Sequence, residues 1–216
     1  MSMEPWEAEE EEHYLRLYAE HRDQALEEFR AERLSAYFLS VPDAAAAPVA
    51  FLDHAERIRP HSNEAALVLA AAANEVAIKT LLLRPLISGL VHAEAVAPLF
   101  ADELLKPTGF ERSKDLLFDL LNRVGEIDLA TYRRDGATRS LWEELKDVAS
   151  KRNAVVHRCA AASAPDVELA LSLSRELLLV LYPQLVEKLG LHLHQRVRVC
   201  AEYHLPPDLE HLLAGA

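Results

Sequence analysis

The apolar residues of this chain recur mostly three and four positions apart, which is the period of an α-helix. The stretch 62–84 is apolar on nearly every side, so it predicts a helix at the centre of a bundle. The stretch 163–189 carries leucine at every fourth position and begins with Ser163-Ala-Pro-Asp166, a capping box with proline in the first turn. Further helices are predicted over 6–39, 43–58, 93–105, 112–124 and 139–157. The pattern therefore predicts an all-α helical bundle.

The end of the chain departs from the helical period. Residues 191–199 alternate between apolar and polar side chains, which predicts a short extended segment. A lone strand is not stable in water, so this segment either pairs with its copy in a dimer or lies along the bundle. His192 and His194 share one side of such a strand, but no third ligand is evident. We therefore predict no metal site.

A chain of 216 residues is long enough to bury one substantial core. The predicted elements divide it into an N-terminal helical extension (1–60), a helical bundle (61–190) and a C-terminal tail (191–216). We expect these three regions to form one compact unit. Pro183 falls inside the last long helix and is predicted to bend it.

The net charge of −12 argues against a general nucleic-acid binder, which would be basic. The acidity is concentrated at the start, because residues 1–32 hold 11 acidic and 3 basic side chains. The rest of the chain is close to neutral, so it can still carry a local basic site. Candidates lie in and before the helix predicted over 139–157, and the alternative is that they only solvate its surface. They are Arg133, Arg134, Arg139, Lys151, Arg152 and Arg158.

The sequence predicts a cytoplasmic protein. The acidic start lacks the basic-then-apolar order of a signal peptide, and no apolar run is as long as an uncharged membrane span. The two cysteines, Cys159 and Cys200, do not form a disulfide framework, which suits a reducing compartment. We therefore expect neither membrane insertion nor secretion.

Arg152 interrupts the apolar face of its own helix. Leu141, Leu145, Val148, Arg152 and Val155 follow one another in steps of four and three, so Arg152 stands where a leucine would be the default. A guanidinium keeps its charge and is costly to bury without a partner. Either the apolar stripe ends at a polar site, or Arg152 is paired there.

The predicted central helix offers a partner for this arginine. Among its few polar residues are Asn74, Glu75 and Lys79. Glu75 and Lys79 are four residues apart and can pair on the surface of their own helix. Alternatively, Glu75 or Asn74 meets Arg152 across the core, where a carboxylate would compensate the guanidinium. The sequence leaves both arrangements open.

Two polar residues close to Arg152 complete a candidate site. Asn153 and His157 are four residues apart, so their side chains share a face, and this face borders that of Arg152. The three side chains converge on one groove if the helix ends or bends near His157. Histidine exchanges protons near neutral pH, and arginine holds a phosphate by two parallel hydrogen bonds. Asparagine can orient the imidazole, and the trio does not resemble a metal site.

The sequence Arg152-Asn153-Ala-Val-Val-His157 on this helix resembles the signature of HEPN domains. These are α-helical bundles, and many are metal-independent endoribonucleases of bacterial defence and toxin–antitoxin systems. The looser resemblance in helix lengths covers roughly residues 62–190. One subfamily carries a modifiable tyrosine two residues after the histidine, where this chain has Cys159, so that mode of control is not expected here.

The resemblance implies cleavage of single-stranded RNA without a metal or cofactor, at a composite site formed by two facing copies in a homodimer. His157 would be the general base or acid, Arg152 would stabilise the transition state, and Asn153 would position His157. Lys151, Arg158 and Arg139 would bind RNA, with Glu75 and Asn74 behind the site. An antitoxin or defence-system component would be a further partner.

The alternative is a catalytically inactive helical module that binds a nucleotide or a partner protein, because a fold does not settle activity. An Arg152 locked in an intramolecular salt bridge, together with a His157 isolated in solvent, would favour this alternative.

Overall fold

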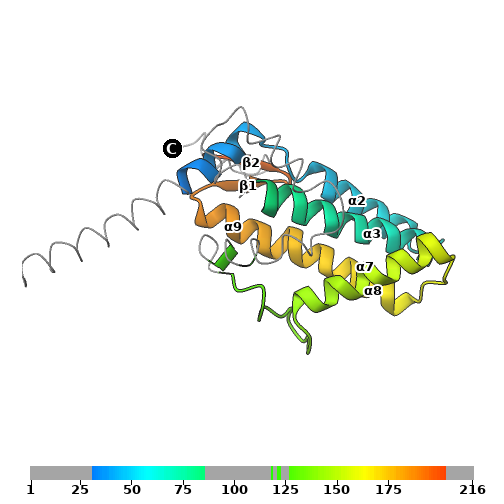
Figure 1. Ribbon diagram of the computed structural model, residues 1–216. Coiled ribbons are helices and arrows are strands. Elements are labelled where there is room, and N and C mark those ends of the chain that lie inside the picture. The colour runs from blue at the N-terminus through cyan, green and yellow to red at the C-terminus, as the bar shows by residue number, and fades with distance from the viewer. Residues whose placement is uncertain (1–30, 86–117, 119–120, 123–126, 203–216) are drawn as a thin grey trace, which may run out of the picture.

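A computed structural model describes residues 31–85, 118, 121–122 and 127–202 of the chain. The protein is mostly helical, which confirms the all-α prediction (Figure 1). Several predictions fall outside the described residues. They concern the acidic segment 1–30, the helix over 93–105 and most of the helix over 112–124.

The first half of the described chain forms helices close to the predicted positions. Residues 31–40 are helical, and α2 (Ala46–Ile58) follows. Helix α3 (Asn63–Ala77) begins at Ser62, whose side chain accepts a hydrogen bond from the Ala65 N–H, as expected of an N-cap serine. It continues into the π-helical segment η1 (Ile78–Leu83) without a break.

The second half forms two long helical rods. Helix α7 (Leu141–Arg158) begins with a capping box between Ser140 and Glu143, two residues later than the sequence pattern indicates. Helix α8 (Ala164–Arg175) begins with the predicted capping box of Ser163 and Asp166. It continues through η3 (Glu176–Leu181) into α9 (Tyr182–Lys188). Pro183 is the second residue of α9, so the wider π turns end two residues before the residue that lacks an N–H donor.

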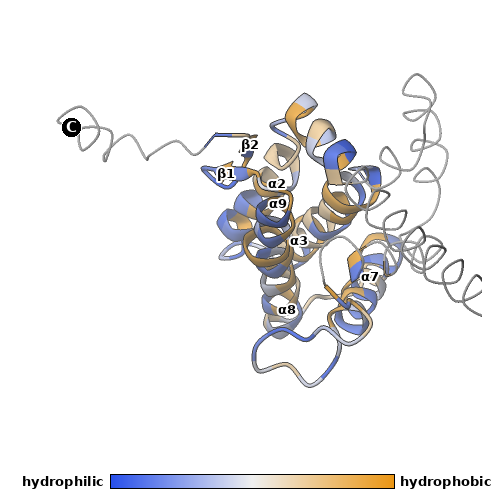
Figure 2. Ribbon diagram, turned by 90° about the vertical axis from the view of Figure 1, so that its left-hand side faces the viewer, coloured by the Kyte–Doolittle hydropathy of each residue, from blue (hydrophilic) through white to orange (hydrophobic). Residues whose placement is uncertain are grey.

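The core lies between α3, α8 and the elements that surround them (Figure 1). Helix α2 packs on α3 and α8, and α7 packs on the same two helices from another side. Apolar positions face the space between the helices and polar positions lie outside (Figure 2). The largest fully buried side chains include Phe38, Leu52, Leu67, Leu171 and Tyr182. Residues 31–58 therefore share their core with α3 and α8.

The two longest apolar helices meet a length and hydropathy test for membrane spans. They are Asn63–Leu83 and Ala164–Lys188, and more than half of each apolar window is buried inside the protein. The central helices of a soluble bundle pass the same test, so the cytoplasmic location stays a prediction.

The C-terminal segment folds back on itself, which the sequence analysis did not foresee. Strand β1 (His192–His194) pairs with the antiparallel strand β2 (Arg198–Cys200), and Leu193 faces Val199 in the register. The prediction of a single strand was wrong, because Gln195 and Arg196 adopt positive φ angles of 50° and 63° and reverse the chain. The hairpin lies along the bundle, since the Val199 N–H donates to the carbonyl of Pro42 at 2.9 Å.

A buried hydrogen-bond network joins α3 to α8. The Ser174 hydroxyl lies 2.8 Å from Asn74 Oδ1, and the Asn74 amide donates to the carbonyl of Ala170 at 3.4 Å. Both side chains are buried. A buried polar group stabilises a core only while it keeps its partners, so this network fixes one relative position of the two helices.

We expect Ser174→Ala to lower the free energy of unfolding by about 1–3 kcal/mol, because it leaves the buried Asn74 oxygen without its donor. Tyr182→Phe is the contrasting variant, since the buried Tyr182 hydroxyl has no hydrogen-bond partner among the described residues. Its removal should be neutral or stabilising by about 1 kcal/mol or less. Urea unfolding followed by circular dichroism measures both. A Ser174→Ala variant as stable as the wild type would contradict the structural role of the network.

Candidate functional site

Helix α7 carries the motif and is fixed on the bundle by its apolar face. Leu141, Leu145 and Val148 are buried, and Arg152 follows on the same face. At the far end, the carboxylate of Glu64 near the start of α3 accepts a hydrogen bond from the Ala162 N–H at 3.1 Å. The C-terminal end of α7 therefore lies beside the N-terminal end of α3, and the two helices run antiparallel.

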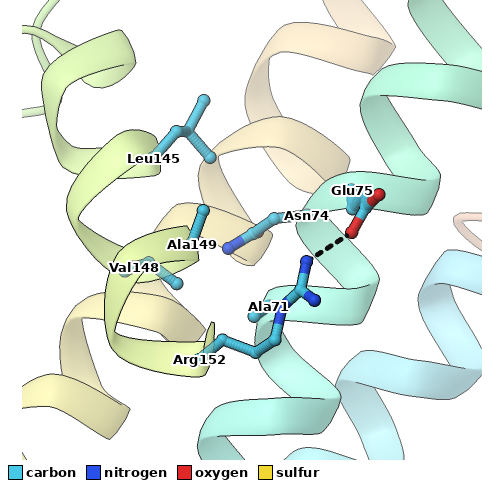
Figure 3. Close-up of a pocket in the computed structure, with 7 residues that line it drawn as sticks. All are labelled: Ala71, Asn74, Glu75, Leu145, Val148, Ala149 and Arg152. Atoms are coloured by element: carbon cyan, nitrogen blue, oxygen red, sulfur yellow. Dashed lines mark hydrogen bonds and ion pairs between the residues drawn. The ribbon is translucent and has the colours of Figure 1, made fainter. Parts of the chain in front are cut away.

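Arg152 is paired across the interface between α7 and α3, as the apolar surroundings required. Its Nη2 lies 2.9 Å from Oε2 of Glu75 (Figure 3). The other oxygen of Glu75 lies 2.8 Å from Nζ of Lys79. Both pairings considered from the sequence are therefore present at once. The Arg152 side chain keeps 29% of its surface exposed, and Glu75 and Lys79 keep 26% each, so the cluster lies at the rim of the bundle.

Asn74 does not bind Arg152, although it lines the same small hollow between α3 and α7 (Figure 3). Its hydrogen bonds go to α8 instead. The hollow has room for only about 10 Å³, which is about one water molecule. A nucleotide cannot enter it, so any ligand of Arg152 approaches from outside the bundle.

Asn153 and His157 point away from this cluster. Both are exposed, and among the described residues neither makes a hydrogen bond or an ion pair. At about 100° per residue, His157 lies about 140° around the helix from Arg152. The helix continues to Arg158 without a bend that would bring the side chains together. The three motif residues therefore do not converge on one groove within a single chain.

Two of the three predicted RNA-binding residues are engaged with carboxylates. Lys151 Nζ lies 2.6 Å from Asp166 and 3.1 Å from Asp147. Arg139 also contacts Asp147, at 3.2 Å, and donates to the carbonyl of Glu143. It precedes the first residue of α7, about 20 Å along the helix axis from Arg152, at 1.5 Å per residue. Arg139 therefore does not belong to the same site.

The other arginines proposed for a basic site are likewise either paired with a carboxylate or exposed to solvent. Arg134 is largely buried and holds Glu144 at 2.8 Å and the Ser172 hydroxyl at 2.9 Å, so it joins the loop before α7 to α8. Arg158 is exposed at the last position of α7, and Arg133 is exposed in the preceding loop. Arg158 alone of the three predicted RNA-binding residues is both exposed and adjacent to His157.

The end of α7 presents an apolar residue to solvent. Val156 is 49% exposed, next to His157. Cys159 caps the helix in a left-handed conformation with φ 52°, and its thiol is free and exposed. A single exposed apolar side chain is ordinary on a protein surface, so Val156 by itself does not mark an interface.

Sequence reasoning overlooked one member of the cluster. Lys79 appeared only as the local partner of Glu75, although the i,i+4 spacing and the predicted Glu75–Arg152 pairing together imply that all three meet. Within the described ranges, no group of three His, Cys, Asp or Glu side chains is placed to hold a metal ion.

Comparison with known proteins found no family model, no curated protein and no solved structure that matches this chain. The resemblance to HEPN domains therefore stays a prediction from the sequence motif.

The ion pair of Lys151 with Asp166 predicts a dependence of stability on pH. The Lys151 ammonium and then the Ser163 hydroxyl lower the pKa of Asp166 to about 2. A carboxyl whose pKa is lowered by folding stabilises the protein above its ordinary pKa, and this contribution is lost as the pH falls toward the folded value. Asp166→Asn keeps an oxygen for the helix cap but removes the charge.

We expect wild type to exceed Asp166→Asn in free energy of unfolding by a constant amount at neutral pH. That difference should shrink as the pH falls from about 4 to about 2. Urea titrations at a series of pH values measure it. A difference that stays constant down to pH 2 would contradict the assignment.

Proposed function

We propose that this chain is a metal-independent endoribonuclease of single-stranded RNA, with a site made by two copies of the chain. The observation that carries the proposal is the divergence of Arg152 and His157 on α7. One chain cannot direct both side chains at one phosphate. Two copies that pair through the exposed ends of their α7 helices can supply Arg152 from one protomer and His157 from its partner. Symmetric dimers are also the commonest oligomers.

The chemistry of the three residue types fits phosphodiester transesterification. The ribose 2′-oxygen attacks the adjacent phosphorus while the bond from phosphorus to the 5′-oxygen breaks. His157 takes the proton from the 2′-hydroxyl or gives one to the leaving 5′-oxygen. Arg152 stabilises the charge that builds on the phosphorane oxygens, and Asn153 orients His157. The products carry 2′,3′-cyclic phosphate and 5′-hydroxyl ends.

The contact between Arg152 and Glu75 leaves most of the guanidinium available. One nitrogen, Nη2, is bound to Glu75, while Nε and Nη1 make no hydrogen bond within the described part of the chain. A single ion pair of this kind orients the side chain, and Nε and Nη1 each remain as a separate donor for a phosphate. Glu75 thus orients the Arg152 side chain without occupying its other donors.

A second candidate is the inactive helical module that binds a nucleotide or a partner protein. The observation that favours it is the same ion pair, because Arg152 is held within the chain while His157 is exposed to solvent. On this account Arg152 stabilises the packing of α7 on α3 and carries no catalytic role. The first proposal also includes a role in bacterial defence, or as a toxin with an antitoxin partner. That role rests on the sequence motif.

We expect purified protein to cleave unstructured RNA in the presence of EDTA. His157→Ala should lower the rate about 10²–10⁴-fold, since it removes proton transfer, with little change in RNA affinity. Arg152→Lys should not restore cleavage, because lysine lacks the planar pair of donors. His54→Ala, which changes an exposed histidine on α2, is the matched control. Cleavage that EDTA abolishes and His157→Ala preserves would contradict the mechanism.

A mixing experiment tests the two-chain site directly. Arg152→Ala and His157→Ala protomers are each expected to be inactive alone. Mixed in equal amounts under conditions that exchange subunits, half of the dimers contain one of each, and each of these keeps one of two Arg–His pairs. Activity should recover to about one quarter of wild type. No recovery, with exchange shown by light scattering or mass spectrometry, would contradict a site shared between protomers.

A further inference from the structure

The positive charges around the motif are unevenly compensated. Arg139 and Lys151 share Asp147, and Lys151 also binds Asp166, so these two cations face two carboxylates. Arg152 and Lys79 face one carboxylate between them, that of Glu75. Of these two clusters, the first is neutral and the second carries a net charge of +1. A polyanion is therefore drawn to the second cluster and not to the residues that the sequence pattern alone suggests.

The geometry of the second cluster suits a phosphate that arrives from solvent. Glu75 uses one oxygen for each cation, so the ammonium and the guanidinium lie on either side of one carboxylate. All three side chains are about one quarter exposed, which leaves donors at the surface. The hollow beneath them holds about one water, so the ligand binds across the rim of α3 and α7.

The antiparallel direction of α3 and α7 determines where Lys79 lies relative to the motif residues. Because α3 and α7 are antiparallel, Lys79 lies beyond Arg152 on the side away from His157. Lys79 lies in η1, which continues α3, about 6 Å further along this continuous helix than Glu75. A strand whose phosphate contacts Arg152 would therefore bring a neighbouring phosphate toward Lys79.

We infer that Lys79 is a substrate-binding residue, which together with Arg152 holds the phosphate backbone of single-stranded RNA, and that Glu75 is the positioning residue for both cations. This inference rests on the proposed function for its substrate. It adds a lysine on η1, the continuation of α3, to the motif residues that α7 supplies.

Binding is tested apart from cleavage by fluorescence anisotropy with a labelled 2′-O-methyl oligouridine, which lacks the attacking hydroxyl. Lys79→Gln should weaken binding about tenfold, as the loss of one charge-assisted hydrogen bond does. The slope of log affinity against log salt should fall by about 0.7, the value for one phosphate contact on a single strand. Arg57→Gln on α2 removes the same charge outside the cluster and should change neither value.

Glu75→Gln separates positioning from charge. It removes the one negative charge of the cluster, so RNA should bind more tightly. It also releases Arg152 from its orientation, so the turnover rate of cleavable RNA should fall while KM does not rise. Urea unfolding of each variant confirms that the fold is intact. Tighter binding with unchanged turnover would overturn the positioning role.

The outcomes distinguish this inference from the proposed function. Loss of affinity in Lys79→Gln without any cleavage by the wild type supports the binding site and contradicts the nuclease. Cleavage by the wild type with equal affinities of Lys79→Gln and Arg57→Gln overturns the role of Lys79 and leaves the nuclease standing. Displacement of the oligonucleotide by inorganic phosphate or uridine monophosphate at constant ionic strength would overturn RNA as the ligand, in favour of a small phosphate compound.

Discussion

The close packing of α3 on α8 is the constraint on which the rest of the structure depends. Helix α3 buries alanine where other helices bury leucine, at Ala66, Ala70, Ala73 and Ala77. Small side chains let two backbones approach, and the Asn74–Ser174 hydrogen bond then fits between them. Because α2 and α7 both pack on this pair, the helix that carries the motif rests on a surface formed jointly by α3 and α8.

The position of Arg152 at the margin of α3 explains why a charged residue is tolerated on the apolar face of α7. At the level of Arg152, α7 faces the margin of α3, where Glu75 is partly exposed. A partly exposed ion pair contributes little net stability, so the arginine is not the optimal choice for packing. Its presence there is better explained by a use for the guanidinium than by the needs of the core, and the proposed contact with phosphate is such a use.

Features set by local sequence were predictable and those set by distant partners were not. The capping box at Ser163 and the helical stripe of α7 depend on residues within a few positions of each other, and both were found. The pairing of Glu75 with Arg152 was one of the arrangements that the sequence left open, because an apolar stripe leaves few partners for a cation. The engagement of Lys151 was missed, since Asp166 belongs to the next helix and only the turn between them brings it near. The hairpin was missed because two ordinary residues, Gln195 and Arg196, adopt backbone angles that favour glycine.

The carboxylate of Asp166 binds groups on two helices at once, and this links the stability of the two helix ends. One of its oxygens accepts hydrogen bonds from the backbone and hydroxyl of Ser163 at the start of α8, while the other binds Lys151 on α7. Fraying of the first turn of α8 therefore also releases the side chain that holds the last turns of α7. The contacts of Asp166 thus link the local stability of these two helix ends. A change at the start of α8 would therefore reach the segment that carries His157, although α8 contains no motif residue.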